Sequence, residues 1–397
     1  MKVIIIQGGI DSSLVTGEKI VIDNDIKFLQ KNDVKVFYEQ IKIPSSGWRS
    51  ISGKIGGLIW SFSSYKKVKS TIDRHKPDIV HFHTVTPYLS FSVISAAVRM
   101  NVPVVQTLHN GRWLCLEGGY FRNNTFCNDC VGSYGWLGVK RGCGHNQFIS
   151  LLLFLNNFIA RRFDFLFKDI SRFIAVSEFV REQHILSGFP KDQILVRNNG
   201  FNFSNFELLE NSWLSRNGIA FAGRLSIAKG ALVLKYLIAH LDCPIKIIGN
   251  GPEFGMLKQY CIDNDFKHVK LIGKIDNSET IEIIRKSVLT VVPSQCGDSF
   301  PTAALESISV GTPVVASNLG GLPDLIGRSG GGVIVEHADY TKFVKVIKEL
   351  LDNKEKVKLL GDNGMNYIRK NISLDKQGKE LVDIYNQVIV EYGGNGK

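Results

Sequence analysis

Short apolar runs, rich in Val and Ile, recur along the chain and alternate with longer segments that mix apolar and charged residues. Runs of this kind are typical of strands in a parallel sheet covered on both faces, and the longer segments have the length of helices. The pattern predicts strands throughout both halves of the chain. They are Lys2–Gln7, Val34–Tyr38, Ile79–His83, Val102–His109, Phe173–Ser177, Ile194–Arg197, Ile219–Gly223, Ile245–Gly249, Val269–Ile275, Leu289–Pro293, Pro313–Ser317 and Gly332–Val335.

Residues 201–217 separate the two sets of strands and follow neither a helical nor a strand period. Two sets of alternating strands and helices predict an α/β protein with two Rossmann-like domains facing across a cleft. A chain of 397 residues also exceeds what one hydrophobic core usually serves. We expect an N-terminal domain over 1–200 and a C-terminal domain over 218–373. Residues 374–397 predict a helix and tail that could pack back on the N-terminal domain.

The net charge of +11 is concentrated in the first half of the chain, where residues 1–200 hold 25 Lys and Arg against 15 Asp and Glu. A basic face attracts phosphate groups, whether in nucleic acid, an anionic membrane or a lipid diphosphate. A solvated surface is the alternative, and the composition does not decide between them. No Lys/Arg cluster is interleaved with aromatic residues, so nucleic acid is not expected as a partner.

No secretory signal is expected, because Met1 and Lys2 lead directly into the first predicted strand. The longest apolar stretch runs from Phe148 to Ala160 and falls short of the ~20 residues that a membrane-spanning helix needs. We interpret it as a core helix in preference to an interfacial one. The sequence thus predicts a cytoplasmic protein, in contact at most with the inner face of the membrane, and its seven cysteines are expected to be reduced.

Four segments of the second half end predicted strands and carry glycines or charges. They are Phe221–Lys229 with Arg224 and Lys229, Gly249–Glu253 with Gly251, the strand end at Ile275, and Asp298–Glu306. Ligands of α/β proteins bind beyond the carboxyl ends of parallel strands, so these segments are expected at one site. Arg and Lys bind diphosphates, and a loop that runs into a helix offers its backbone N–H groups to a phosphate. The segments therefore predict a nucleotide or nucleotide-sugar site.

In this order the segments resemble family 4 glycosyltransferases, which are retaining enzymes of the two-Rossmann GT-B type. The residues that match are Arg224, Lys229, Gly249, Gly251, Pro252, Glu253 and Glu306. The resemblance implies that Arg224 and Lys229 hold the donor diphosphate and that Glu306 holds the nucleotide ribose. Asp298 stands where the family has a glutamate, the first acid of a catalytic pair with Glu306, so its role is open.

The loop between the two acids is expected to offer its backbone N–H groups to the donor phosphates. Pro301 has no N–H, which leaves Phe300, Thr302 and Ala303 as the donors.

On the acceptor side, His109 ends a predicted strand, and the resemblance implies that it lies near the donor sugar and the acceptor. It would position groups and polarise the site, while the leaving phosphate helps to take the acceptor proton. His81 and His83 flank Phe82, and strand alternation predicts that only one of them faces any given way. The opening glycine loop of the family is present only as Gly8-Gly9, without its usual following acid.

Four cysteines lie within a presumed insertion at about 113–146, namely Cys115, Cys127, Cys130 and Cys143, with His145 nearby. Four soft ligands around a C-x2-C turn suit a structural zinc ion, although the outer spacings are irregular. Four reduced thiols in an ordered loop are the alternative, and the sequence leaves both open. A subset of the resembling family carries similar cysteines.

The sequence therefore predicts a retaining hexosyltransferase that moves a sugar from a UDP- or GDP-type donor to a saccharide or lipid-linked acceptor, with no cofactor required for chemistry. Polysaccharide, O-antigen or other glycoconjugate biosynthesis is the expected setting. Two alternatives are a GT-B-shaped sugar-nucleotide epimerase, which needs positioned acids and bases, and a non-enzymatic basic protein that binds a membrane surface.

Overall fold

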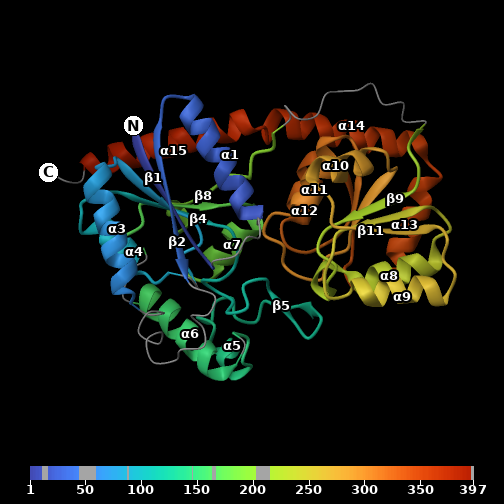
Figure 1. The fold of residues 1–397 in the computed structure, drawn as a ribbon, viewed down its shortest axis with the longest axis horizontal. Helices are drawn as coiled ribbons and strands as arrows, with labels where there is room; N and C mark the ends of the chain where they lie inside the picture. The colour runs from blue at the N-terminus through green and yellow to red at the C-terminus, as the bar shows by residue number, and fades with distance from the viewer. Residues whose placement is uncertain are drawn as a thin grey trace. The chain divides into compact units, whose positions relative to one another are not determined.

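The computed structural model describes residues 1–10, 17–43, 60–86, 89–144, 146–162, 167–202 and 215–394. The chain divides into two compact units, and each has its own sheet with helices around it (Figure 1). The N-terminal unit comprises Met1–Tyr120, Asn128–Gly200 and Leu374–Lys397; the C-terminal unit comprises Phe121–Cys127 and Phe201–Ser373. Two parallel sheets in two units confirm the predicted two-domain α/β class.

The sheet of the N-terminal unit is parallel throughout, in the order β2-β1-β3-β4-β7-β8. Its strands are β1 (Lys2–Ile10), β2 (Lys35–Ile43), β3 (Ile79–Phe82), β4 (Val104–Leu108), β7 (Arg172–Ala175) and β8 (Ile194–Val196). Consecutive side chains from Val3 to Ile6 are fully buried, so both faces of β1 are covered. The chain leaves β1 toward β2 on one side and returns to β3 on the other, so the topological switch point lies between β1 and β3.

Helix α15 completes the core on one face of this sheet, where it lies beside α1 (Figure 1). Tyr385 and Val388 of α15 pack with Ile22 and Leu29 of α1. The approach is close at Gly378, because a Cβ there would lie 2.2 Å from the Phe28 ring. The helices of this unit are α1 (Gly17–Lys31), α3 (Phe62–His75), α4 (Ser92–Val98), α5 (Trp136–Lys140), α6 (Gln147–Arg162), α7 (Glu178–Leu186) and α15 (Leu374–Gly394).

The sheet of the C-terminal unit is also parallel, in the order β11-β10-β9-β12-β13-β14. Its strands are β9 (Ile219–Ala222), β10 (Ile245–Ile248), β11 (Val269–Gly273), β12 (Leu289–Val292), β13 (Val314–Ser317) and β14 (Gly332–Val335). The strand order reverses between β9 and β12, which places the switch point there. A short antiparallel pair, β5 (Phe121–Arg122) and β6 (Thr125–Phe126), also belongs to this unit.

Alternate side chains of β13 supply the two cores of this unit. Val315 packs in one core with α8, α9 and α13, whereas Val314 and Ala316 pack in the other with α11, α12 and α14. The helices are α8 (Ala231–His240), α9 (Phe254–Asp263), α10 (Asn277–Arg285), α11 (Thr302–Ser309), α12 (Leu322–Ser329), α13 (Tyr340–Leu351) and α14 (Lys354–Asn371). Burial on both faces is why these strands read as continuous apolar runs.

Every predicted strand coincides with an observed strand, with ends that differ by a few residues. The apolar stretch from Phe148 to Ala160 lies in α6, which buries Leu152 and Leu153 while Phe148 stays exposed. Most of the predicted linker, residues 203–214, falls outside the described residues. Within the described part of the chain, no helix combines the length and apolar character needed to cross a membrane.

Candidate active site

Glycines bring the loops after β9 and β10 into direct backbone contact. Gly249 has a φ of 125°, and a Cβ there would lie 1.9 Å from the carbonyl oxygen of Gly223. A Cβ on Gly251 would lie 2.2 Å from the carbonyl oxygen of Leu225, whose own N–H donates to Asn250 O at 3.0 Å. Only glycine fits such approaches. The turn singled out in the sequence therefore packs against the segment that carries Arg224.

Lys229 and Asp298 meet across the switch point of this sheet. Lys229 ends a short 3-10 helix (Ile227–Lys229) after β9, and its Nζ pairs with Oδ1 of Asp298, which follows β12. Ser294 Oγ donates to the other carboxylate oxygen at 2.7 Å, and Cys296 Sγ lies 3.7 Å from Oδ1. Burial alone would lower the pKa of Lys229, but the adjacent Asp298 carboxylate raises it. Lys229 is therefore held as a cation.

Glu306 lies in the second turn of α11 and has a different partner from Asp298. Asn277 Nδ2 donates to its Oε1 at 2.9 Å. Burial raises the pKa of Glu306, and the hydrogen bond from Asn277 acts in the opposite direction. Asn277 was not predicted, because an Asn in the first turn of α10 carries no signal for a contact 29 residues away.

The other residues predicted to bind the sugar donor follow strands of the same sheet, on loops or at the start of α11. The first backbone bond of α11 is Leu305 N to Pro301 O, so the N–H groups of Thr302 and Ala303 precede the helical ladder. Phe300 is half-buried beside them, and Arg224 is exposed. Ile275 is half-buried and follows β11. The N–H of Gly249, directly after β10, donates to the carbonyl oxygen of Gly273 at the end of β11 at 2.8 Å.

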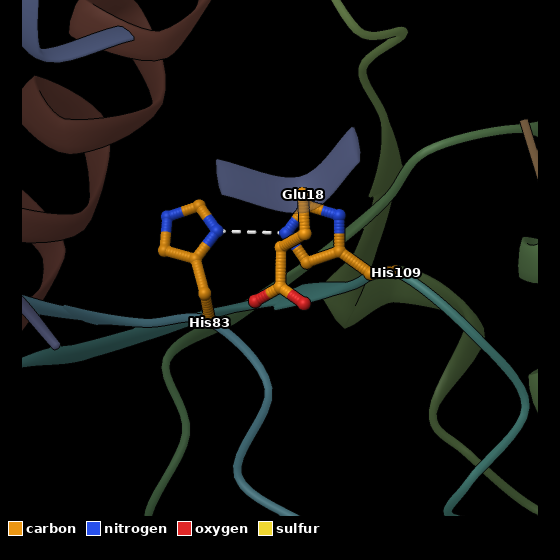
Figure 2. A group of neighbouring side chains, drawn as sticks. All are labelled: Glu18, His83 and His109. Atoms are coloured by element: carbon orange, nitrogen blue, oxygen red, sulfur yellow. Dashed lines mark hydrogen bonds between the residues drawn. The ribbon is translucent and has the colours of Figure 1, made fainter. Parts of the chain in front are cut away.

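In the N-terminal unit, His83 and His109 form a hydrogen-bonded pair. His83 follows β3, His109 follows β4, and His83 Nδ1 lies 2.7 Å from His109 Nε2 (Figure 2). Their rings are stacked, with centroids 5.0 Å apart. Burial lowers the pKa of both side chains, although Glu18 and Asp25 act against this for His109. Both imidazoles are therefore neutral near pH 7.

His81 has a different role from its neighbour. Its Nδ1 lies 2.6 Å from the Tyr385 hydroxyl and its Nε2 lies 2.7 Å from the Thr107 hydroxyl, so both ring nitrogens are satisfied inside the core. The prediction that alternation separates His81 from His83 was wrong. Residues two apart along a strand share a face, and the two rings lie only 4.3 Å apart. Hydrogen bonding, not strand alternation, assigns His83 to His109.

Glu18 joins this pair and was missed in the sequence. It lies in the first turn of α1, accepts a hydrogen bond of 2.5 Å from the Thr84 hydroxyl, and lies alongside the two imidazoles (Figure 2). One ligand-type atom of each of Glu18, His83 and His109 lies within 4.8 Å of the other two, a set that could hold a divalent cation. The available signal in the sequence was an acid in the first turn of an amphipathic helix.

The four cysteines are not gathered as ligands among the described residues, since no three of their sulfur atoms lie within 4.8 Å of one another. Cys115 and Cys130 are buried, whereas Cys127 and Cys143 are half-buried. Burial raises the pKa of the Cys115 thiol despite backbone hydrogen bonds that lower it. His145 falls outside the described residues. The zinc site stays a prediction.

Two family models together span most of the chain. Residues 47–205 match Glycosyltransferase Family 4, and residues 210–367 match Glycosyl transferases group 1. The chain belongs to glycosyltransferase family 4. Its transferase activity is therefore supported over the epimerase and the non-enzymatic alternatives.

Relatives of known sequence agree with this assignment. An uncharacterized glycosyltransferase, MJ1178 of Methanocaldococcus jannaschii, is 25% identical over 319 residues, which cover 80% of this chain and 78% of the relative. A D-inositol 3-phosphate glycosyltransferase of Corynebacterium urealyticum is 27% identical over 185 residues, 43% of each chain.

Solved structures show the same GT-B fold. Anabaena Alr3699/HepE in complex with UDP has a TM-score of 0.69 at 16% identity and covers 98% of this chain and 100% of its own. Sucrose-phosphate synthase from Thermosynechococcus elongatus has a TM-score of 0.70 at 15% identity, with the same coverage. At this identity the likeness concerns the fold alone.

Proposed function

We propose that this glycosyltransferase transfers a sugar, with retention of configuration, from a nucleoside diphosphate donor to a saccharide or lipid-linked saccharide acceptor. The observation that carries the proposal is the Lys229–Asp298 pair at the β9/β12 switch point, beside loops packed backbone to backbone. α/β folds bind the phosphates of nucleotides at the switch point, and a cation held there can contact them.

The donor diphosphate binds to Lys229 and Arg224 in this proposal. Lys229 is positioned by its carboxylate partner but is 37% exposed, so its remaining N–H groups can reach a ligand. Arg224 is exposed and able to bind two phosphate oxygens at once. The early amides of α11 add uncharged donors to the same group. HepE, which shares the fold, is described in complex with UDP and with UDP-glucose, which favours a uridine donor here.

Glu306 binds the nucleotide ribose. A carboxylate accepts hydrogen bonds from the two ribose hydroxyls, and Asn277 keeps its Oε1 in place. Asp298 acts mainly through Lys229, because its oxygens are already engaged by Lys229 and Ser294. We therefore assign Asp298 to positioning within the catalytic pair of acids.

His109 serves the acceptor side. A small cavity in the N-terminal unit is lined by Thr84, Gln106, His109, Asn110 and Trp113, and Gln106 Oε1 has no hydrogen-bond partner among the described residues. At about 10 Å³ the cavity has room for roughly one hydroxyl group, to which these side chains can hydrogen-bond. Retention follows from attack on the face that the diphosphate leaves, with the leaving phosphate taking the acceptor proton. The chemistry needs no cofactor, and any zinc at the cysteines would be structural.

Contact with an anionic membrane from the cytoplasmic side would bring a lipid-linked acceptor within reach, as expected for polysaccharide, O-antigen or other glycoconjugate biosynthesis. Helices α5 and α6 pack together and expose Trp136 and Phe148, with Lys140 exposed at the end of α5. Aromatic and basic side chains together favour a bilayer interface.

A nucleotide-sugar screen tests the function. UDP-glucose, UDP-N-acetylglucosamine and GDP-mannose are each added to the purified protein, and the unfolding temperature is measured. A ligand present at 100 times its Kd stabilises by about 2.7 kcal/mol through mass action. The donor found is then assayed for transfer to saccharide and lipid-linked acceptors, and the anomeric configuration of the product is read by NMR. If no nucleotide sugar stabilises the protein or is consumed, the proposal fails.

A further inference from the structure

The hydrogen bond between His83 and His109 has a direction that the surroundings determine. His83 is 1% exposed, and its Nε2 is a buried atom without a partner among the described residues. His109 uses Nε2 in the pair, which leaves Nδ1 as its only ring nitrogen for a ligand. Two ring nitrogens 2.7 Å apart share one proton, and either ring can supply it.

The two arrangements differ in what they leave buried at His83. If His109 donates, the proton of neutral His83 is on Nε2, and a buried N–H has no acceptor. If His83 donates from Nδ1, its Nε2 carries only a lone pair. Buried N–H groups without a partner are rarer in proteins than under-satisfied acceptors. Donation from His83 Nδ1 to His109 Nε2 is therefore favoured.

We propose that His83 is a positioning residue that holds His109 as the neutral tautomer with its proton on Nδ1. His109 then presents an N–H donor to an oxygen of the acceptor, and it has no free lone pair with which to take the acceptor proton. The inference rests on the proposed function in so far as His109 faces substrate. It deepens that function by assigning proton removal to the leaving phosphate and hydrogen-bond donation to His109.

A metal ion shared by the two histidines and Glu18 would be a competing arrangement. Two nitrogen ligands at 2.0–2.1 Å from zinc are separated by about 2.8–3.4 Å for angles between 90° and tetrahedral. The separation of 2.7 Å between His83 Nδ1 and His109 Nε2 is shorter than this and is an ordinary hydrogen-bond length. The geometry thus favours a shared proton over a shared cation.

The test is NMR of the protein labelled with 15N-histidine, in which one- and two-bond couplings assign the tautomer of each ring. We expect His109 protonated on Nδ1 in the wild type. His83→Asn should keep this tautomer, because the Asn amide nitrogen occupies the place of Nδ1. His83→Leu should shift the His109 proton toward His109 Nε2. His83→Gln should do the same, because the Gln amide reaches the place of His83 Nε2 and not that of His83 Nδ1.

Turnover supplies the second readout. His83→Leu and His83→Gln should lower kcat about 10- to 100-fold, as for loss of one hydrogen bond in the transition state, with the donor KM changed less than threefold. His83→Asn should stay within about threefold of wild type. A wild-type His109 protonated on Nε2 overturns the proposal, as does a His83→Leu variant with unchanged tautomer. Stoichiometric zinc binding that requires His83 and Glu18 also overturns it. The wild-type and His83→Asn spectra decide the question even if the Leu variant does not fold or no donor is found.

Discussion

Replacing Lys229 with methionine removes a charge from the proposed diphosphate site while keeping the length of the side chain. In the structure, Lys229 Nζ is oriented by Asp298, and 37% of the side chain remains exposed to a ligand. A hydrogen bond to a charged group contributes about 1.5–3 kcal/mol, so Lys229→Met should weaken binding of a nucleoside diphosphate about 10- to 100-fold. Asp298 keeps its hydrogen bond from Ser294, so the fold should persist.

The matched control is Lys267→Met, because Lys267 pairs with Asp265 on the surface and its side chain is 84% exposed. Isothermal titration with UDP and GDP measures the Kd of each variant, and circular dichroism checks the fold. Binding of the nucleotide within twofold of wild type in Lys229→Met would refute the assignment. An equal loss in both variants would show a long-range charge effect in place of a contact, and measurement at two salt concentrations would identify it, since long-range effects are screened.

Four further predictions concern other residues. Glu306→Gln should weaken binding of UDP about tenfold and leave inorganic pyrophosphate binding unchanged, because Glu306 is proposed to contact only the ribose. Gly249→Ala should abolish nucleotide binding, since the new Cβ meets Gly223 O, whereas Gly255→Ala has open space and should stabilise α9 by about 0.5–1 kcal/mol. Burial lowers the pKa of His184 to about 4, so the protein should lose stability as the pH falls from 6.5 toward 4. Elemental analysis tests the zinc site, and about one zinc per chain, reduced in Cys130→Ser, would support it.

The sign of the pH effect follows from proton binding. Between pH 6.5 and 4 the unfolded chain protonates His184 while the folded protein keeps it neutral, so each such histidine contributes a slope of about 1.4 kcal/mol per pH unit. His81, His83 and His109 act in the same direction, since burial lowers the pKa of each. An unfolding temperature that is flat from pH 7 to 5 would contradict this account.

The other three predictions have equally direct tests. Unchanged UDP affinity in Glu306→Gln would remove the ribose contact. Normal nucleotide binding by Gly249→Ala would show that the loop relaxes around the added methyl group. Fully active protein without zinc would leave the cysteines as reduced thiols.

The secondary structure was predictable because its causes are local. A strand buried on both faces needs consecutive apolar residues, as in Val3–Ile6, and this pattern is visible without any knowledge of the partner strands. The Gly249–Glu253 turn was visible for a similar reason, since only glycine permits the backbone to approach so closely. The resemblance to the family added the expected roles of Arg224 and Lys229.

The partners of the polar side chains were not predictable, because they come from distant parts of the chain. Glu18 meets Thr84 from 66 residues away, Lys229 meets Asp298 from 69, and His81 meets Tyr385 from 304. No periodicity encodes such pairs. They depend on which strand ends the topology places side by side. For the same reason His81 is a core residue, whereas His83 contacts His109.

The elements, the two-domain α/β class and the segments that follow the carboxyl ends of the strands were thus visible in the sequence alone, because apolar period and glycine geometry act over a few residues. The contacts of Lys229 with Asp298, of Glu18 with Thr84 and of His83 with His109 depend on the tertiary structure. The physical reason is that hydrogen bonding and desolvation depend on what surrounds an atom in space, and the order of residues along the chain does not specify those surroundings locally.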